Sequence, residues 1–95
     1  MPYFALIYEV VDDYIERRAS LRQAHLKIAA DAHAKGELIL GGAFADPPDK
    51  VLIVFHAADK NVAEDFARND PYVIHGLVKK WEVRPWTVVI GGPQA

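Results

Sequence analysis

The chain has 95 residues, of which 52% are hydrophobic and 25% charged, a balance that suits one globular domain over residues 1–95 and argues against disorder. Its net charge of −2 provides no basic surface for a nucleic-acid partner, and the lack of cysteine excludes disulfides and thiolate metal sites. No apolar run approaches the ~20 residues of a membrane-spanning helix and no leader-like segment comes before the first expected strand, so we expect a soluble cytoplasmic protein without a membrane partner.

A strand and a long helix are expected at the start of the chain. Residues 3–10 (YFALIYEV) are rich in aromatic and aliphatic side chains, which is typical of a strand. A helix is expected over residues 14–35, and Gly36 is the residue that ends it. The apolar residues of this helix share one side, which should face the sheet: Leu21, Ile28, Ala29 and Ala32.

Two strands joined by a proline-containing turn should follow. Residues 37–44 predict a strand in which Gly41 and Gly42 favour a bulge or a close approach of the backbone to a neighbouring residue. The turn at residues 46–49 contains two prolines, which exclude it from a strand. Residues 50–57 then predict the next strand of the sheet.

The last part of the chain predicts a short helix and a final strand. Asp59 is positioned to cap the helix, and the Asp70-Pro71 dipeptide breaks it. After a loop or a single turn, the final strand is expected within residues 78–90. Pro85 cannot donate a backbone hydrogen bond, so it predicts a bulge or a sheet edge in that strand.

The resulting order of elements is β-α-β-β-α-β, which is the order of a ferredoxin-like α+β fold. Both helices should cover one face of a four-stranded antiparallel sheet. Apolar side chains nevertheless occupy both sides of the strands at residues 3–10 and 50–57, so the second face also needs a cover. We therefore predict a homodimer that packs sheet to sheet, with assembly beyond the dimer left open.

His25 is the first candidate for chemistry, because the expected helix places it on the side that faces the sheet. Arg18 and Arg22 lie on the same arc, toward the N-terminus of the helix. Two interpretations stay open at this point. In the first, His25 is a satisfied core histidine and the arginines extend to solvent or pair with acids. In the second, the three residues form an anion-binding cleft in which His25 transfers protons.

Asp70 is the second candidate, although an aspartate before a proline is commonly a turn former. The sequence does not place Asp70 beside His25. Other kinds of site find little support, because the four histidines lack the spacing of metal ligands and no glycine-rich loop leads from a strand into a helix. We therefore expect no metal and no cofactor, and a small molecule as the binding partner.

Three short segments resemble the YciI-like (YCII-related) family. Residues 18–26 (RASLRQAHL) resemble its R-x-S-x-R-x-x-H-L stretch. Residues 70–73 (DPYV), followed by Gly76, resemble its D-P-[YF]-V-x-x-G segment, and residues 83–86 (VRPW) resemble its V-[KR]-P-[FW] signature. The order and distances of these motifs agree with the family over nearly the whole chain. The connection at residues 45–49 departs from it, because some members have a longer loop there.

The resemblance implies a fold, an active site and a set of binding residues. The family is known for a dimeric α+β barrel, and its proposed active site is a His–Asp pair that maps onto His25 and Asp70. In such a pair the carboxylate accepts one imidazole N–H, and the other nitrogen acts as general base and acid. The remaining site residues would hold an anionic substrate oxygen (Arg18, Ser20, Arg22) or line an apolar wall (Tyr8, Tyr72).

Enzymes that resemble this family include dehalogenating lyases of chloroaromatic catabolism, which act on chloromuconolactone or chlorinated hydroxyquinol. Proton abstraction beside a carbonyl, followed by loss of chloride, needs no metal or redox cofactor and therefore suits this sequence. The leading hypothesis is a cofactor-free lyase that eliminates HCl from a small oxygenated ring, or a related isomerase. Two alternatives stay open: a non-catalytic dimer that binds a small anion, and a cofactor-free oxygenase.

Overall fold

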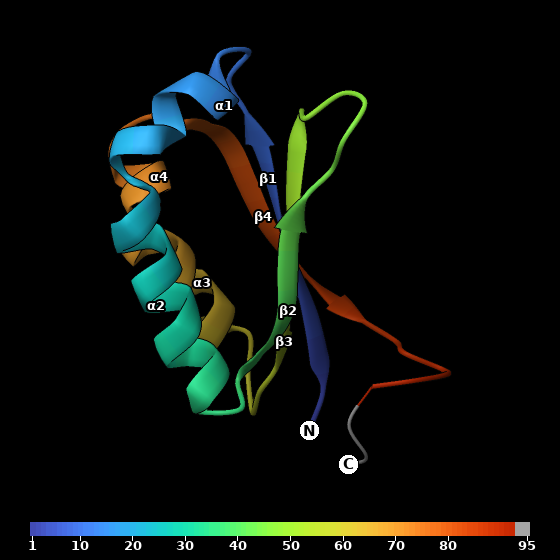
Figure 1. Ribbon diagram of the computed structural model, residues 1–95. Helices are drawn as coiled ribbons and strands as arrows, with labels where there is room; N and C mark the ends of the chain where they lie inside the picture. Colours follow the sequence, from blue (N-terminus) through green and yellow to red (C-terminus); the bar gives the residue numbers. More distant parts are fainter. Residues whose placement is uncertain (93–95) are drawn as a thin grey trace.

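The helices of the protein lie together on one face of a four-stranded antiparallel sheet (Figure 1). This computed structural model describes residues 1–92. The strands are β1 (Tyr3–Val10), β2 (Leu38–Ala43), β3 (Lys50–His56) and β4 (Val78–Trp86). Their order across the sheet is β2-β3-β1-β4, which confirms the predicted ferredoxin-like α+β fold. Within residues 1–92, no helix has the length and apolar character that crossing a membrane requires.

Strand β1 lies inside the sheet and determines which side chains enter the core. It pairs with β3 and β4, so that Leu6 lies opposite Ile53 on one side and Val83 on the other. Because successive side chains of a strand point to opposite faces, every second residue of β1 points toward the helices. All of these residues are buried: Phe4, Leu6, Tyr8 and Val10.

The predicted helix over residues 14–35 is divided into three parts, which corrects that expectation. Helix α1 (Tyr14–Arg17) leads into a 3₁₀ turn (Arg18–Ser20), and α2 (Arg22–Ala34) starts after Leu21. Leu21, with φ −109° and ψ −5°, joins the 3₁₀ turn to α2, and the chain changes direction there. As a result, α1 lies across the end of the sheet while α2 runs along its face (Figure 1). The residues predicted to face inward do pack against the core: Leu21, Ile28, Ala29 and Ala32.

More regular structure follows the second predicted helix than the expected loop. Helix α3 (Asn61–Asn69) begins just after Asp59, whose carboxylate accepts a hydrogen bond of 2.8 Å from the first N–H of the helix. A short helix, α4 (Pro71–Ile74), then follows, because the Asp70 side chain caps it and Pro71 has the backbone angle that a first helical turn requires. The chain therefore makes a corner at Asp70 between two helices.

Two smaller predictions concern β2 and β4, the edge strands of the sheet. Pro85 lies in β4, where an edge position was one of the two expected explanations for it. In β2, a Cβ atom added at Gly41 would lie 3.3 Å from the side chain of Ile53, so this glycine permits the expected close approach. The irregular register of β2 lies earlier in the strand, between Leu38 and Leu40.

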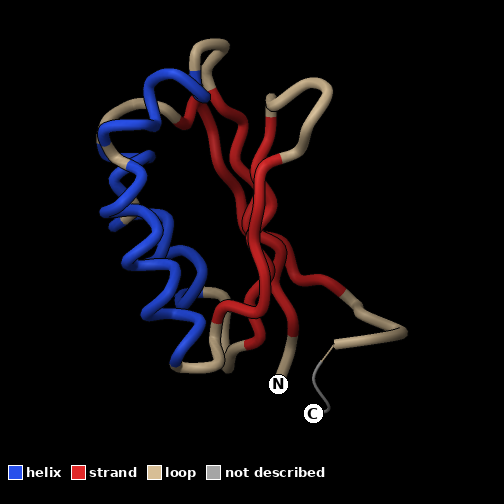
Figure 2. The backbone as a smooth tube through the Cα atoms, viewed as in Figure 1, coloured by secondary structure: helices blue, strands red, loops and turns tan. Residues whose placement is uncertain are grey.

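The face of the sheet away from the helices is covered by no helix of residues 1–92 (Figure 2). Apolar side chains lie on this face. Trp86 is 47% exposed and Leu40 is 62% exposed on this open face. A hollow of about 300 Å³ on this face is lined by residues of three strands: Ala5, Ile7, Leu52, Arg84, Pro85 and Trp86. The second apolar face that the strand pattern predicts is thus present, and the homodimer that it suggests stays a prediction.

Candidate active site

The carboxylate of Asp70 is fully buried at the corner between α3 and α4. It accepts hydrogen bonds from groups of three different elements: the Tyr8 hydroxyl of β1 at 2.7 Å, the His25 ring of α2 at 2.9 Å and the backbone N–H of Tyr72 in α4 at 3.0 Å. A buried carboxylate is expensive unless donors of this kind surround it. The three contacts therefore fix the position of Asp70 and stabilise it inside the protein.

His25 is held by two contacts that together determine the orientation of its ring. Its Nδ1 atom lies 2.9 Å from Oδ1 and 3.0 Å from Oδ2 of Asp70. The ring also stacks on Tyr72, with the ring centroids 3.9 Å apart and the planes 9° from parallel. When Nδ1–H donates to the carboxylate, Nε2 is the nitrogen left with a lone pair. The His25 side chain is 13% exposed, so a ligand has access to it.

A cavity of about 170 Å³ adjoins this pair, between the helical layer and the β2–β3 half of the sheet. Its wall on the sheet side is aliphatic, while its wall on the helix side carries aromatic, imidazole and guanidinium groups. Pockets for drug-sized ligands span about 300–1,000 Å³, so this volume suits a molecule of about one ring. The lining residues are Tyr14, Arg18, Arg22, His25, Leu26, Ala29, Leu38, Gly41, Gly42, Ala43, Val51, Ile53 and Tyr72.

Two cationic side chains give the cavity a positive potential. Arg18 and Arg22 both line it, and the guanidinium carbon of Arg18 lies 5.3 Å from the centre of the Tyr14 ring. The positive charges act on Tyr72: burial and Tyr14 raise the pKa of the Tyr72 hydroxyl, whereas Arg22 and Arg18 oppose that rise. The balance is a raised pKa, so Tyr72 keeps its proton at neutral pH. The cavity therefore combines a neutral phenol with two fixed cations.

Tyr8 lies beneath this cavity and not in its wall, which differs from the expected apolar contact with a ligand. It is fully buried, and its hydroxyl donates to Asp70. Burial is the main cause that raises the pKa of Tyr8 far above 10, and the negative charge of Asp70 and the hydrogen bond to it add to the shift. The Tyr8 hydroxyl therefore keeps its proton at neutral pH and donates it in a hydrogen bond to Asp70.

The structure brings together all but one of the candidate site residues predicted from the sequence. Ser20 is exposed and lines a different hollow, together with Leu21 and His75, so it does not contact the cavity. Tyr14 was missed, although it is buried, lines the cavity and packs edge-on against Tyr72. The aliphatic wall was missed as well. Its only sequence signal was the Gly41–Gly42 pair, which permits the close approach of β2 to β3.

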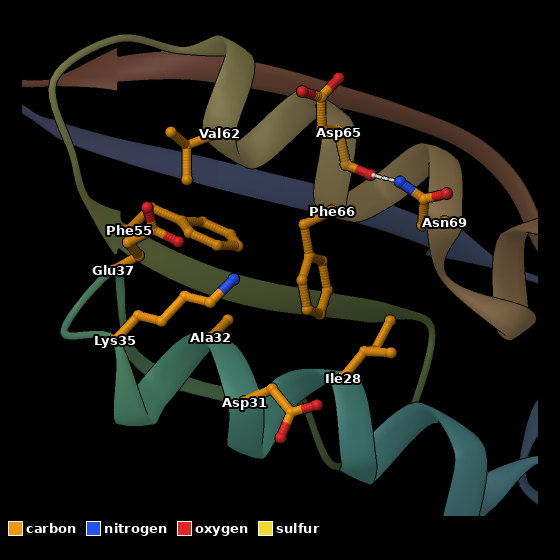
Figure 3. A pocket seen from close by; sticks show the side chains of 10 residues that line it. All are labelled: Ile28, Asp31, Ala32, Lys35, Glu37, Phe55, Val62, Asp65, Phe66 and Asn69. Atoms are coloured by element: carbon orange, nitrogen blue, oxygen red, sulfur yellow. Dashed lines mark hydrogen bonds between the residues drawn. The ribbon is translucent and has the colours of Figure 1, made fainter.

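A larger hollow of about 420 Å³ lies between α2 and α3, and it is a weaker candidate for chemistry (Figure 3). Its floor is formed by the rings of Phe55 and Phe66, which pack edge to face. The acids at its rim are paired along their own helices, Asp31 with Lys27 and Asp65 with Arg68. None of its lining residues forms a His–Asp contact like the one beside the smaller cavity. Over residues 1–92 no cluster of three or more histidine, aspartate and glutamate residues is arranged to hold a metal ion.

Comparison with known families and curated proteins gives one match. The family model of the YCII-related domain matches residues 1–87, and no curated protein matches the chain.

Solved structures with the same fold include proteins with different descriptions. 5-Chloro-2-hydroxyhydroquinone dehydrochlorinase from Burkholderia phenoliruptrix AC1100, in complex with 2,5-dihydroxybenzoquinone, has a TM-score of 0.74 and 18% identity over 90% of this chain and 93% of that chain. Protein Atu4242 from Agrobacterium tumefaciens has a TM-score of 0.64 and 14% identity over 100% of both chains. A candidate antibiotic biosynthesis monooxygenase from Deinococcus radiodurans has a TM-score of 0.58 and 15% identity over 100% of this chain and 99% of that chain. At identities this low, the structural similarity shows that these proteins share a fold and nothing more.

Proposed function

The chain belongs to the YCII-related family, and from this membership and the geometry of the cavity we propose that it is a cofactor-free lyase in which His25 and Asp70 transfer a proton. The observation that carries the proposal is the contact of 2.9 Å between the buried carboxylate and the His25 ring, next to a cavity that fits one ring. The substrate class that we propose is a small chlorinated hydroxyquinol or muconolactone, from which the enzyme eliminates HCl.

The proposed reaction needs one base and one leaving group. His25 removes a proton from a hydroxyl or from a carbon beside a carbonyl of the substrate, through its Nε2 atom. The electron pair left behind forms a new double bond, and chloride departs with the electrons of the C–Cl bond. For a chlorinated hydroxyquinol this step acts on the keto tautomer, in which the chlorine-bearing carbon is tetrahedral, and the product is a hydroxyquinone. Asp70 stabilises the imidazolium that forms, which then releases the proton to solvent, so the products are the dechlorinated ring and HCl.

Arg18 and Arg22 supply the electrostatic part of this proposal. Both line the cavity that His25 adjoins, so an anionic substrate oxygen can lie between their guanidinium groups. The aliphatic wall formed by Leu38, Val51 and Ile53 excludes water from the remaining edge of the ring. The name of the dehydrochlorinase with the same fold supports this reaction class, and its ligand is also a small oxygenated ring.

We also propose that two copies of the chain associate through the open face of the sheet. This face is apolar at its centre, and it carries charges of both signs at its margin, including the pair formed by Lys80 and Glu9 at 3.7 Å. A surface with both signs of charge can pair with a second copy of itself across a two-fold axis. A second copy would also remove Trp86 from solvent.

The experiment that tests the proposed reaction measures chloride release from chlorohydroxyquinol and chloromuconolactone. We expect His25→Ala and Asp70→Asn each to lower the rate about 10²–10⁴-fold, the range typical of a lost proton-transfer group. Matched controls are His75→Ala and Asp65→Asn, which change the same residue types at exposed positions. They should keep the rate of the wild type.

Three other outcomes are informative. Equal rates in all variants would mean that His25 and Asp70 are structural. Binding of the ring compounds by the wild type without any chloride release would identify a binding protein and contradict the lyase. Consumption of oxygen together with a hydroxyquinol would identify the oxygenase alternative.

A further inference from the structure

We propose that the hydroxyl of Tyr72 forms, with Arg18 and Arg22, an oxyanion subsite of the cavity, and that the substrate is a planar ring with an ionised oxygen bound there. This inference deepens the proposed function and rests on it for the reaction, although it concerns binding alone. It also changes the expected role of Tyr72 from an apolar wall residue to a hydrogen-bond donor.

The first observation is an unsatisfied hydroxyl. Tyr72 is 1% exposed, and among residues 1–92 its Oη atom is buried without a hydrogen-bond partner. A buried hydroxyl without a partner costs about 10- to 100-fold in an equilibrium constant, so most such groups in proteins are satisfied. The ring of Tyr72 lines the cavity. Arg22 acts on the Tyr72 oxygen as a donor, but a guanidinium has no acceptor, so among residues 1–92 the hydroxyl proton still lacks one. A ligand oxygen in the cavity would supply that acceptor.

The second observation is that the ring of Tyr72 cannot turn away from the cavity. One face stacks on His25 with the centroids 3.9 Å apart, and Tyr14 packs edge-on against it with the centroids 5.7 Å apart. The backbone N–H of Tyr72 is bound to Asp70. The ring is therefore held by packing, which leaves the hydroxyl proton free to donate, as expected of a preorganised donor.

The third observation is the sign of charge around this hydroxyl. Arg18 and Arg22 line the same cavity and both favour negative charge at the Tyr72 oxygen. Burial nevertheless raises the pKa of Tyr72, so the phenol stays protonated and can donate. A neutral donor beside two cations attracts an anionic oxygen and not a neutral carbonyl or a cation. The stack on His25 places the proton acceptor and the donor on the same wall, so one planar ring can reach both.

The probe for this subsite is 4-nitrophenol, whose ionised and neutral forms absorb at different wavelengths. We expect the wild type to bind the phenolate in preference to the neutral form and to nitrobenzene, which has no phenol oxygen. In Tyr72→Phe the ring, its stack on His25 and the backbone contact to Asp70 are retained, and only the hydroxyl is lost. We expect this variant to bind the phenolate about 10- to 100-fold more weakly. Its affinity for nitrobenzene should stay within about twofold of the wild type.

A second pair of variants keeps the inference testable if Tyr72→Phe folds poorly. Arg18→Gln should weaken phenolate binding, whereas Arg17→Gln, the neighbouring arginine with an exposed side chain, should not. The subsite is overturned if Tyr72→Phe loses phenolate and nitrobenzene affinity equally, or if the wild type does not prefer the phenolate. Chloride release tests proton transfer separately: equal rates in the wild type and His25→Ala would overturn the proposed reaction and leave the phenolate preference of the wild type, and with it the subsite, standing.

Discussion

Asp70 is the residue on which the site depends, because it receives donors from β1, α2 and α4 at once. The sequence nominated both His25 and Asp70 but not their contact, because 45 residues separate them and their meeting depends on how α2 packs against the corner of α3 and α4. Tyr8 shows more clearly why the sequence alone could not predict the contacts of the site. In a strand that alternates buried residues, a tyrosine that holds a carboxylate has the same pattern as one that only fills the core.

Tyr8→Phe should change the stability of the protein at alkaline pH. Burial raises the pKa of Tyr8 in the folded state, so folding protects its proton and this contribution is complete below the unfolded value of about 10. As the pH rises above about 10, the unfolded chain loses the proton first and stability falls. In the wild type this loss makes the free energy of unfolding fall by about 1.4 kcal/mol for each pH unit above about 10. Without the phenol, Tyr8→Phe should lack this fall.

Denaturant unfolding between neutral pH and strongly alkaline pH measures this slope. At neutral pH, Tyr8→Phe should be about 1 kcal/mol less stable, because Asp70 loses a donor. Phe4→Leu is the control, since it perturbs the same buried side of β1 without contact to Asp70. It should lower stability at every pH and keep the slope of the wild type. An unchanged slope in Tyr8→Phe would show that the phenol does not titrate with folding.

Among the elements, the sequence predicted the strands, but it did not predict how the helices are divided. The strand alternation, Gly41 and Pro85 predicted the sheet and its edges. The division of the first helix at Leu21 had no such signal, because no glycine or proline lies between Tyr14 and Ala34. Helix α4 was expected as a loop or single turn, since Asp-Pro is a common turn dipeptide and also a good helix start.

The two chemical roles of Asp70 at the start of α4 can be separated by substitution. Asparagine retains the cap of α4, whereas alanine removes both the cap and the charge. Asp70→Ala should therefore be about 1 kcal/mol less stable than Asp70→Asn, while both lack chloride release. The asparagine amide can also donate to Nδ1 of His25, which would leave the proton on Nε2 and remove the base.

Denaturant unfolding and chloride release measured on the same preparations check this separation. Asp65→Ala and Asp65→Asn, at an exposed position in the middle of α3, provide the matched comparison and should differ little in stability. Equal stability of the two Asp70 variants would mean that the cap contributes nothing to α4.

At the scale of the whole molecule, the open face of the sheet is the side that no helix of residues 1–92 covers. The sequence predicted this apolar face, because the side chains on both sides of two strands are hydrophobic. A sheet with only one covered face needs hydrophobic side chains on one side alone. Single apolar residues at a surface need no explanation, but the exposed Trp86 lines a hollow whose other residues come from three strands.

Leu52→Glu should convert the proposed homodimer to a monomer, because it places a charge in the centre of the open face. Sedimentation equilibrium or light scattering at micromolar concentration measures the change. Ile74→Glu is the control, since Ile74 is 63% exposed in α4 on the other side of the molecule. It should leave the dimer intact. A wild type that stays monomeric at micromolar concentration would rule out the proposed interface.

The cavity is built from two separable parts of the chain. The groups proposed for proton transfer and the cations come from the helical layer, while the aliphatic wall comes from the hairpin of β2 and β3. Substitutions at positions such as Val51 or Ile53 can therefore change which rings fit without moving His25 or Asp70. In terms of the proposed function, this arrangement would let the range of bound rings change at the aliphatic wall while the His25–Asp70 contact stays in place.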